Sequence, residues 1–112
     1  MKIKDKTIVI TGAGRGIGRA LAIRFATQGA HIALLDMNAA DLAAATQQCV
    51  DLGVRAKAYT VDVSREAEVA AVLDAVVRDF GSLDVIVNNA GIVKDALLIK
   101  VKDGDVVVVK HG

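Results

Sequence analysis

The chain has 112 residues, the usual size of one domain, and 54% of them are hydrophobic, which is enough for a substantial core. The formal net charge of +1, without a basic cluster, argues against a nucleic-acid partner, and the single cysteine, Cys49, excludes an internal disulfide. Because no apolar run approaches the roughly 18 residues of a membrane span and the N-terminus lacks a signal-peptide pattern, we expect a soluble cytoplasmic protein without membrane contact.

The first two strands and the helix between them are predicted from the pattern of apolar residues. Residues 6–11 form a β-branched run that stops at a glycine cluster, which is typical of a strand buried on both faces. Behind the glycines, Ile17, Leu21 and Phe25 recur every four residues and define one stripe of a helix. Residues 31–35 predict a second buried strand.

The next helix is marked at both ends, by Asn38 as its N-cap and by Gly53 as its stop. Its apolar positions are spaced three, four and three residues apart, and they are Leu42, Ala45, Cys49 and Leu52.

A third strand at residues 57–61 is followed by a helix, for which we expect Ser64 to be the N-cap and Gly81 the stop. The apolar face of this helix lies within residues 69–80, and residues 83–87 form a fourth strand.

This order of elements, β-α-β-α-β-α-β with short links, predicts an α/β fold. Right-handed crossovers and fully buried strands make it a Rossmann-like half-domain, a three-layer sandwich with a parallel sheet in the order 3-2-1-4 and helices on both faces. We therefore expect one domain over residues 1–112, with a core at 1–91 and an atypical tail at 92–112.

The tail is compatible with two structures. An Asp-Gly pair lies between two β-prone runs, 96–102 and 105–109, which is a strong signal for a hairpin. Alternatively, residues 94–102 form a helix and residues 105–109 form a fifth parallel strand beside the fourth, covering a bare edge. The hairpin is the structure we favour.

A glycine-rich loop, Gly12-Ala-Gly-Arg-Gly-Ile-Gly18, connects the first strand to the first helix. A diphosphate requires backbone N–H groups aimed at it, no Cβ in the way and the positive end of a helix, and such a turn provides all three. Because the loop lies in a β-α-β unit with an acidic residue downstream, it predicts a dinucleotide-binding site.

The residue that selects the dinucleotide is expected to be Asp36, at the end of the second strand. A carboxylate there accepts the hydroxyls of the adenosine ribose and repels a 2′-phosphate. Arg15 favours NADP instead, because a guanidinium pairs with a 2′-phosphate. We give Asp36 more weight, so NAD is the predicted cofactor and NADP the second choice.

The ligand is expected between the first and fourth strands, where the strand order reverses. The glycine loop and Asn89-Ala-Gly91 would line this crevice, and Asp62 with Val63 would border the adenine. One of the two adjacent asparagines, Asn88 or Asn89, is expected to tie neighbouring strands together.

The motifs Thr11-Gly-Ala-Gly-Arg-Gly-Ile-Gly18 and Asn88-Asn-Ala-Gly91 resemble the two N-terminal signatures of the short-chain dehydrogenase/reductase family. The resemblance covers about residues 5–104, and residues 91–100 are further similar to the 3-oxoacyl-acyl-carrier-protein reductase branch. It implies the NAD(P)(H)-binding half of an oxidoreductase. The cofactor-binding residues it implies are Gly12, Gly14, Arg15, Gly16, Ile17, Gly18, Asp36, Asp62, Val63, Asn89, Ala90 and Gly91.

The catalytic residues of that family find no counterpart in this sequence. The family uses a tyrosine, a lysine four residues later and a serine, whereas the one tyrosine here, Tyr59, is followed at that spacing by Val63. The two serines, Ser64 and Ser82, are interpreted as a helix cap and a turn residue. We therefore expect a truncated domain with no catalytic residue, no metal site and no activity of its own.

Two alternatives remain beside the oxidoreductase hypothesis. One is a non-catalytic nucleotide-binding module, and the other is a structural fragment that self-associates through an unpaired sheet edge and the Val-rich tail. Exposed helix faces and the sheet edge both predict a homo-oligomer.

Overall fold

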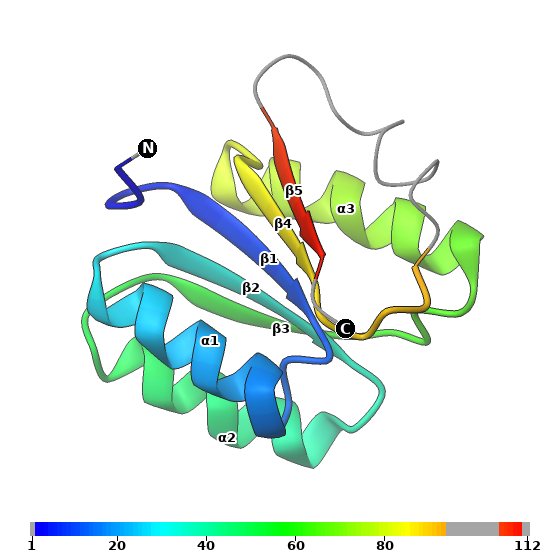
Figure 1. Cartoon of the computed structure of the whole chain (residues 1–112), viewed down its shortest axis with the longest axis horizontal. Helices are drawn as coiled ribbons and strands as arrows, with labels where there is room; N and C mark the ends of the chain where they lie inside the picture. Colours follow the sequence, from blue (N-terminus) through cyan, green and yellow to red (C-terminus); the bar gives the residue numbers. More distant parts are fainter. Residues whose placement is uncertain (1, 94–105, 111–112) are drawn as a thin grey trace.

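A five-stranded, fully parallel sheet runs through the molecule. Its strands are β1 (Thr7–Thr11), β2 (His31–Asp36), β3 (Ala56–Thr60), β4 (Val85–Asn88) and β5 (Val107–Lys110). They lie in the order β3-β2-β1-β4-β5, so the chain crosses from one side of β1 to the other after β3 (Figure 1).

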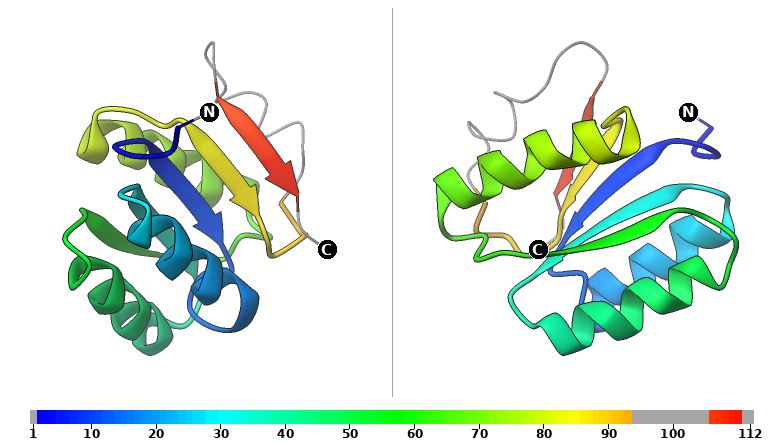
Figure 2. Two further views of the ribbon diagram at one scale, coloured as in Figure 1. Left: turned by 60° about the vertical axis from the view of Figure 1, so that its left-hand side comes forward. Right: turned by 180° about the vertical axis from the view of Figure 1, so that it is seen from behind.

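Helices cover both faces of this sheet in the computed structural model, which describes residues 2–93 and 106–110. Helices α1 (Gly16–Thr27) and α2 (Ala39–Val50) lie on one face and α3 (Glu66–Phe80) on the other (Figure 2). The predicted three-layer Rossmann-like arrangement with the 3-2-1-4 core is confirmed.

The fifth strand extends the sheet beyond the predicted core. β5 pairs with β4 in parallel, with Val107 opposite Val85 and Val109 opposite Val87. A fifth strand parallel to the fourth was predicted by the alternative structure of the tail and not by the favoured hairpin. The first arm of the hairpin and the helix of the alternative both fall on residues 94–105, outside the described residues.

Two apolar cores lie on the two faces of the sheet. On the α3 side, Val9, Leu35 and Ile86 pack with the apolar stripe of α3 that the sequence predicted. On the other side, Ile8, Ile10, Ile32 and Leu34 pack with α1 and α2, and the following larger side chains are completely buried there: Ile8, Ile10, Ile32, Leu34 and Leu42. β1 is buried along its whole length, as predicted.

The packing face of α1 differs from the predicted stripe. Gly18, Ala22 and Ala26 are the buried residues of this helix, whereas Ile17 is 55% exposed. Small residues face β1 because the helix starts almost against the preceding strand, where larger side chains have no room. Leu21 and Phe25 are half-buried at the side of this contact.

The ends of α2 and α3 test the capping predictions. Asn38 caps α2 as predicted, with its Oδ1 accepting the N–H of Asp41 at 2.9 Å. Ser64 does not cap α3: the N-cap residue is Arg65, and the Ser64 hydroxyl donates to Asp62 instead. Gly81 ends α3 in the left-handed region, with φ of 85°.

None of the helices in the described part of the chain is long and apolar enough to cross a membrane.

Candidate functional site

The loops that follow β1 and β4 meet at the carboxyl edge of the sheet. β1 is hydrogen-bonded to β2 on one side and to β4 on the other, so the strand order reverses here. Gly12 has φ of +65°, and a Cβ placed on it would lie 3.0 Å from Asn89 Nδ2 and 3.6 Å from Ala90 Cα. The glycine loop and the Asn-Asn-Ala-Gly turn are therefore neighbours, at the place where open α/β sheets bind ligands.

A buried hydrogen-bond network fixes these two loops to each other. The Thr11 hydroxyl donates to Asn88 Oδ1 at 3.1 Å and accepts the N–H of Ala90 at 3.0 Å. Asn88 in turn donates through Nδ2 to the carbonyl of Val93 at 3.0 Å, and Asn89 donates to the Gly12 carbonyl at 3.4 Å. The expectation that one asparagine ties neighbouring strands is confirmed for Asn88, which joins β4 to β1.

The N-terminus of α1 opens on this crevice without a cap of its own. The N-cap residue, Arg15, makes no side-chain cap hydrogen bond, and the first turn carries no acidic residue. Since the first N–H groups of a helix lack intrahelical acceptors, the turn that begins at Gly16 presents donors and a positive dipole end to an external anion. Arg15 and Ile17 are both exposed beside it.

Two N–H groups of the glycine loop are already used inside the protein. Ala13 donates to the carbonyl of Leu35 at 3.1 Å, and Gly14 donates to Asp36 Oδ2 at 2.9 Å. The loop therefore offers an anion the donors from Arg15 onward rather than all of its amides, which refines the prediction from the sequence.

Asp36 lies at the end of β2 with both carboxylate oxygens held by the main chain. In addition to the bond from Gly14, its Oδ1 accepts the N–H of Met37 at 2.7 Å. A carboxylate has about four acceptor positions, so further donors such as ribose hydroxyls can still bind to it. Asp36 is half-buried, which leaves it accessible from the crevice.

A small cavity of about 180 Å³ lies beyond Asp36, at the carboxyl end of β3. It is lined by Met37, Thr60, Val61, Asp62 and Glu68. Of these five residues, only Asp62 was predicted from the sequence as a site residue. The position of Met37 directly after Asp36 is the signal that would have added it.

The two residues expected to border the adenine differ in their placement. Asp62 lines the cavity, and hydrogen bonds from the hydroxyl and N–H of Ser64 hold the pKa of its carboxyl below the usual value. Val63 is buried in the core on the α3 face, so only its main chain is available at this border.

Tyr59 and Ser82 lie away from the crevice. The Tyr59 hydroxyl donates to Asp79 Oδ2 at 2.8 Å, and burial and this hydrogen bond raise the pKa of the phenol. The Ser82 hydroxyl lies 3.1 Å from the hydroxyl of Thr7, at the amino end of β1. The contacts of both residues thus give each of them a structural role.

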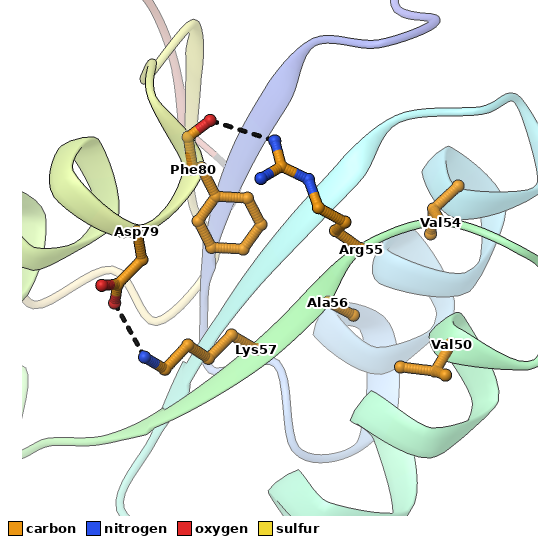
Figure 3. Close-up of a pocket in the computed structure, with 7 residues that line it drawn as sticks. All are labelled: Val50, Val54, Arg55, Ala56, Lys57, Asp79 and Phe80. Carbon is orange, nitrogen blue, oxygen red and sulfur yellow. Dashed lines mark hydrogen bonds and ion pairs between the residues drawn. The ribbon is translucent and has the colours of Figure 1, made fainter.

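A second cavity, of about 380 Å³, lies near the amino end of β3, where Val50 of α2 and Asp79 and Phe80 of α3 also line it (Figure 3). Its charged side chains are engaged with their surroundings: Lys57 Nζ is 2.8 Å from Asp79 Oδ2, and Arg55 donates to the Phe80 carbonyl at 3.0 Å. Among residues 2–93 and 106–110, no group of three His, Cys, Asp or Glu side chains could hold a metal ion.

Comparisons with known proteins agree with this geometry. A family model described as short chain dehydrogenase matches residues 6–109. Among curated proteins, a 3-oxoacyl-[acyl-carrier-protein] reductase of Thermotoga maritima is 35% identical over 105 residues, and a galactitol 2-dehydrogenase of Agrobacterium fabrum is 42% identical over 92 residues. The matches cover 94% and 82% of this chain but 43% and 35% of those proteins. The chain thus spans less than half the length of the curated relatives it matches.

Solved structures give the same result. The crystal structure of NAD+-bound xylitol dehydrogenase superposes with a TM-score of 0.78 at 46% sequence identity, covering 81% of this chain and 35% of that one. A short chain dehydrogenase/reductase from Burkholderia phymatum in complex with NAD superposes equally well, at 36% identity.

Proposed function

This chain belongs to the short-chain dehydrogenase family, and on that basis we propose that it is the NAD-binding half of an NAD(P)(H)-dependent oxidoreductase. One observation carries the proposal: the uncapped N-terminus of α1 lies beside the Asp36 carboxylate at the reversal point of the sheet. The similar solved structures that hold NAD support it.

The proposed binding mode assigns each part of the dinucleotide to a set of main-chain or side-chain groups. The N–H groups at the start of α1, in the segment Arg15 to Gly18, hold the diphosphate, and Gly12 leaves room for the turn at Asn89 and Ala90 beside it. Asp36 accepts the hydroxyls of the adenosine ribose, and the adenine enters the cavity lined by Met37 and Asp62. The wall of the crevice opposite the glycine loop is formed by Asn89, Ala90 and Gly91.

The chain is proposed to bind the cofactor without turning over a substrate. Bound NAD supplies hydride transfer in this family, but proton transfer to the substrate needs an acid that the described residues do not place in the crevice, since Tyr59 is committed to Asp79. The similarity of residues 91–100 to the 3-oxoacyl-acyl-carrier-protein reductases supports a reductase of that type. We also propose a cytoplasmic location.

Calorimetric titration of the purified chain with NAD, NADP and ADP-ribose tests this function. We expect NAD and ADP-ribose to bind with dissociation constants within about threefold of each other, because the described contacts address only the adenosine and diphosphate, and NADP to bind about tenfold more weakly because its 2′-phosphate meets Asp36. Absence of heat with all three, or tighter binding of NADP, would contradict the proposal.

A second candidate function, self-association, rests on the β5 side of the sheet. Val107 and Val109 are 40% and 45% exposed, and they border an apolar groove of about 420 Å³ that Leu21 and Phe25 also line. A homo-oligomer that covers these side chains would remove apolar surface from water. Light scattering that gives the mass of a monomer at all concentrations would refute it.

A further inference from the structure

We propose that Gly14 is a specificity-determining residue, because it gives the Asp36 carboxylate the space and the hydrogen bond that fix it for a ribose without a 2′-phosphate. This inference rests on the proposed NAD-binding function. It assigns Gly14 a role through Asp36 rather than a contact with the diphosphate.

Space, not backbone conformation, is the reason for a glycine at position 14. Gly12 and Gly16 have φ of +65° and +59°, in the region that disfavours side chains, but the φ of Gly14 is outside that region. A Cβ built on Gly14 would lie 2.8 Å from Asp36 Oδ2 and 2.9 Å from Asp41 Cβ. Any other residue here must therefore displace its neighbours.

Of these two neighbours, Asp36 is the one that can move. Asp41 belongs to the first turn of α2, and its N–H is bound to the cap residue Asn38 at 2.9 Å, so its Cβ is attached to a fixed backbone. The Asp36 carboxylate is the end of a side chain and can rotate away. A methyl group at position 14 is thus expected to push the carboxylate out of its place.

That place is defined entirely by main-chain donors. Gly14 N–H binds Oδ2 at 2.9 Å and Met37 N–H binds Oδ1 at 2.7 Å, so the carboxylate is positioned by the loop and the end of β2. Its remaining acceptor positions are fixed with it, and two adjacent ribose hydroxyls need such a fixed pair of acceptors. Displacement weakens both this bonding and the repulsion of a 2′-phosphate, while the exposed Arg15 in the same loop keeps attracting the phosphate.

The test is a double-mutant cycle with the variants Gly14→Ala, Asp36→Ala and the double variant, titrated with ADP-ribose and with 2′-phospho-ADP-ribose. The measured quantity is the ratio of the two dissociation constants. A general loss of loop order weakens the binding of both nucleotides alike and so leaves this ratio unchanged. We expect Gly14→Ala to reduce the preference for ADP-ribose about tenfold, the effect of losing hydrogen bonds to a charged group. In the Asp36→Ala background, the same substitution should change the ratio less than about twofold.

The results that overturn the inference differ from those that overturn the function. An unchanged ratio in Gly14→Ala, or an equal shift with and without Asp36, refutes the role of Gly14 while leaving nucleotide binding intact. Failure of the unsubstituted chain to bind either nucleotide refutes the proposed function itself.

Hydrogen exchange provides a readout that needs no ligand and no folded Gly14 variant. We expect the Gly14 amide to exchange more slowly in the unsubstituted chain than in Asp36→Ala, whereas the Ala13 amide, bound to the Leu35 carbonyl, exchanges equally in both. Equal exchange of the Gly14 amide in the two proteins would show that the carboxylate is not held by the loop. Gly53→Ala meets nothing within 4 Å but is strained at φ of +92°, so it is the control for a general loss of stability in all titrations.

Discussion

The two edge strands of the sheet, β3 and β5, differ in how their side chains are covered. β3 contacts α2, and its Lys57 and Tyr59 both bind Asp79 of α3, so these three side chains form a polar clamp that ties the strand to α3. β5 carries Val107 and Val109 with 40% and 45% of their surface exposed, next to an apolar groove. The comparison suggests that stability is concentrated on the side of the sheet from β3 to β1, whereas the β5 side holds apolar surface suited to association.

The largest expected contrast is between a buried leucine of β2 and an exposed valine of β5. Leu34 is completely buried, so Leu34→Ala should lower the free energy of unfolding by about 2–5 kcal/mol, because it leaves a cavity in the core. Val109→Ala should cost less than about 1 kcal/mol, because little surface is buried there. Urea denaturation of both variants measures the difference, and equal losses would show that β5 is as integral to the core as β2.

The next effect concerns the contact between α1 and β1 on the covered side. A Cβ on Gly18 would overlap the carbonyl oxygen of Gly12, so Gly18→Ala must push the helix away from the loop. We expect a loss of about 1–3 kcal/mol together with loss of ADP-ribose binding.

Gly53→Ala is the control for that prediction. Gly53 has φ of +92° with nothing within 4 Å, so alanine there is strained only by its backbone and should cost about 1 kcal/mol without changing binding. Binding by Gly18→Ala equal to that of Gly53→Ala would mean that the close approach of α1 does not shape the loop.

The smallest expected effect comes from the polar clamp at the β3 edge. Burial and the bond to Asp79 raise the pKa of Tyr59, so folding favours the neutral phenol. Its contribution to stability is therefore complete below about pH 10, the ordinary tyrosine value, and is lost as the pH rises above it.

Tyr59→Phe tests this contribution. It removes one hydrogen bond, which should cost about 0.5–1.5 kcal/mol at neutral pH. Above about pH 10, the stability of the unsubstituted chain should fall more steeply than that of Tyr59→Phe, whereas below about pH 10 the difference between the two should stay constant, as measured by urea denaturation at each pH. Parallel curves would indicate that the clamp is not linked to the ionisation of Tyr59.

Much of the fold follows from local signals in the sequence. The β-branched run of β1, the cap at Asn38 and the stop at Gly81 each act within a few residues, and all three are where the sequence predicted them. Ser64 misled the prediction because its hydroxyl had a competing acceptor two residues away, in Asp62, which is a local alternative to a helix cap.

The location of the two loops was predictable, and so was a tie between strands through one of the asparagines, but the partners of the individual hydrogen bonds were not. The motifs place the glycine loop and the Asn-Asn-Ala-Gly turn at the reversal of the sheet, as the strand order requires. The bond from Gly14 to Asp36 and the one from Thr11 to Asn88 join residues 22 and 77 positions apart, so they depend on tertiary packing that no local pattern encodes. The same holds for the exposure of Ile17, which is decided by how closely α1 approaches β1.

The Thr11 hydroxyl has a consequence for the energetics of ligand capture. Because it contacts both the side chain of Asn88 and the main chain of Ala90, the two walls of the crevice are linked to each other before a ligand binds. An incoming nucleotide then need not spend binding energy on the conformational entropy of aligning one wall with the other.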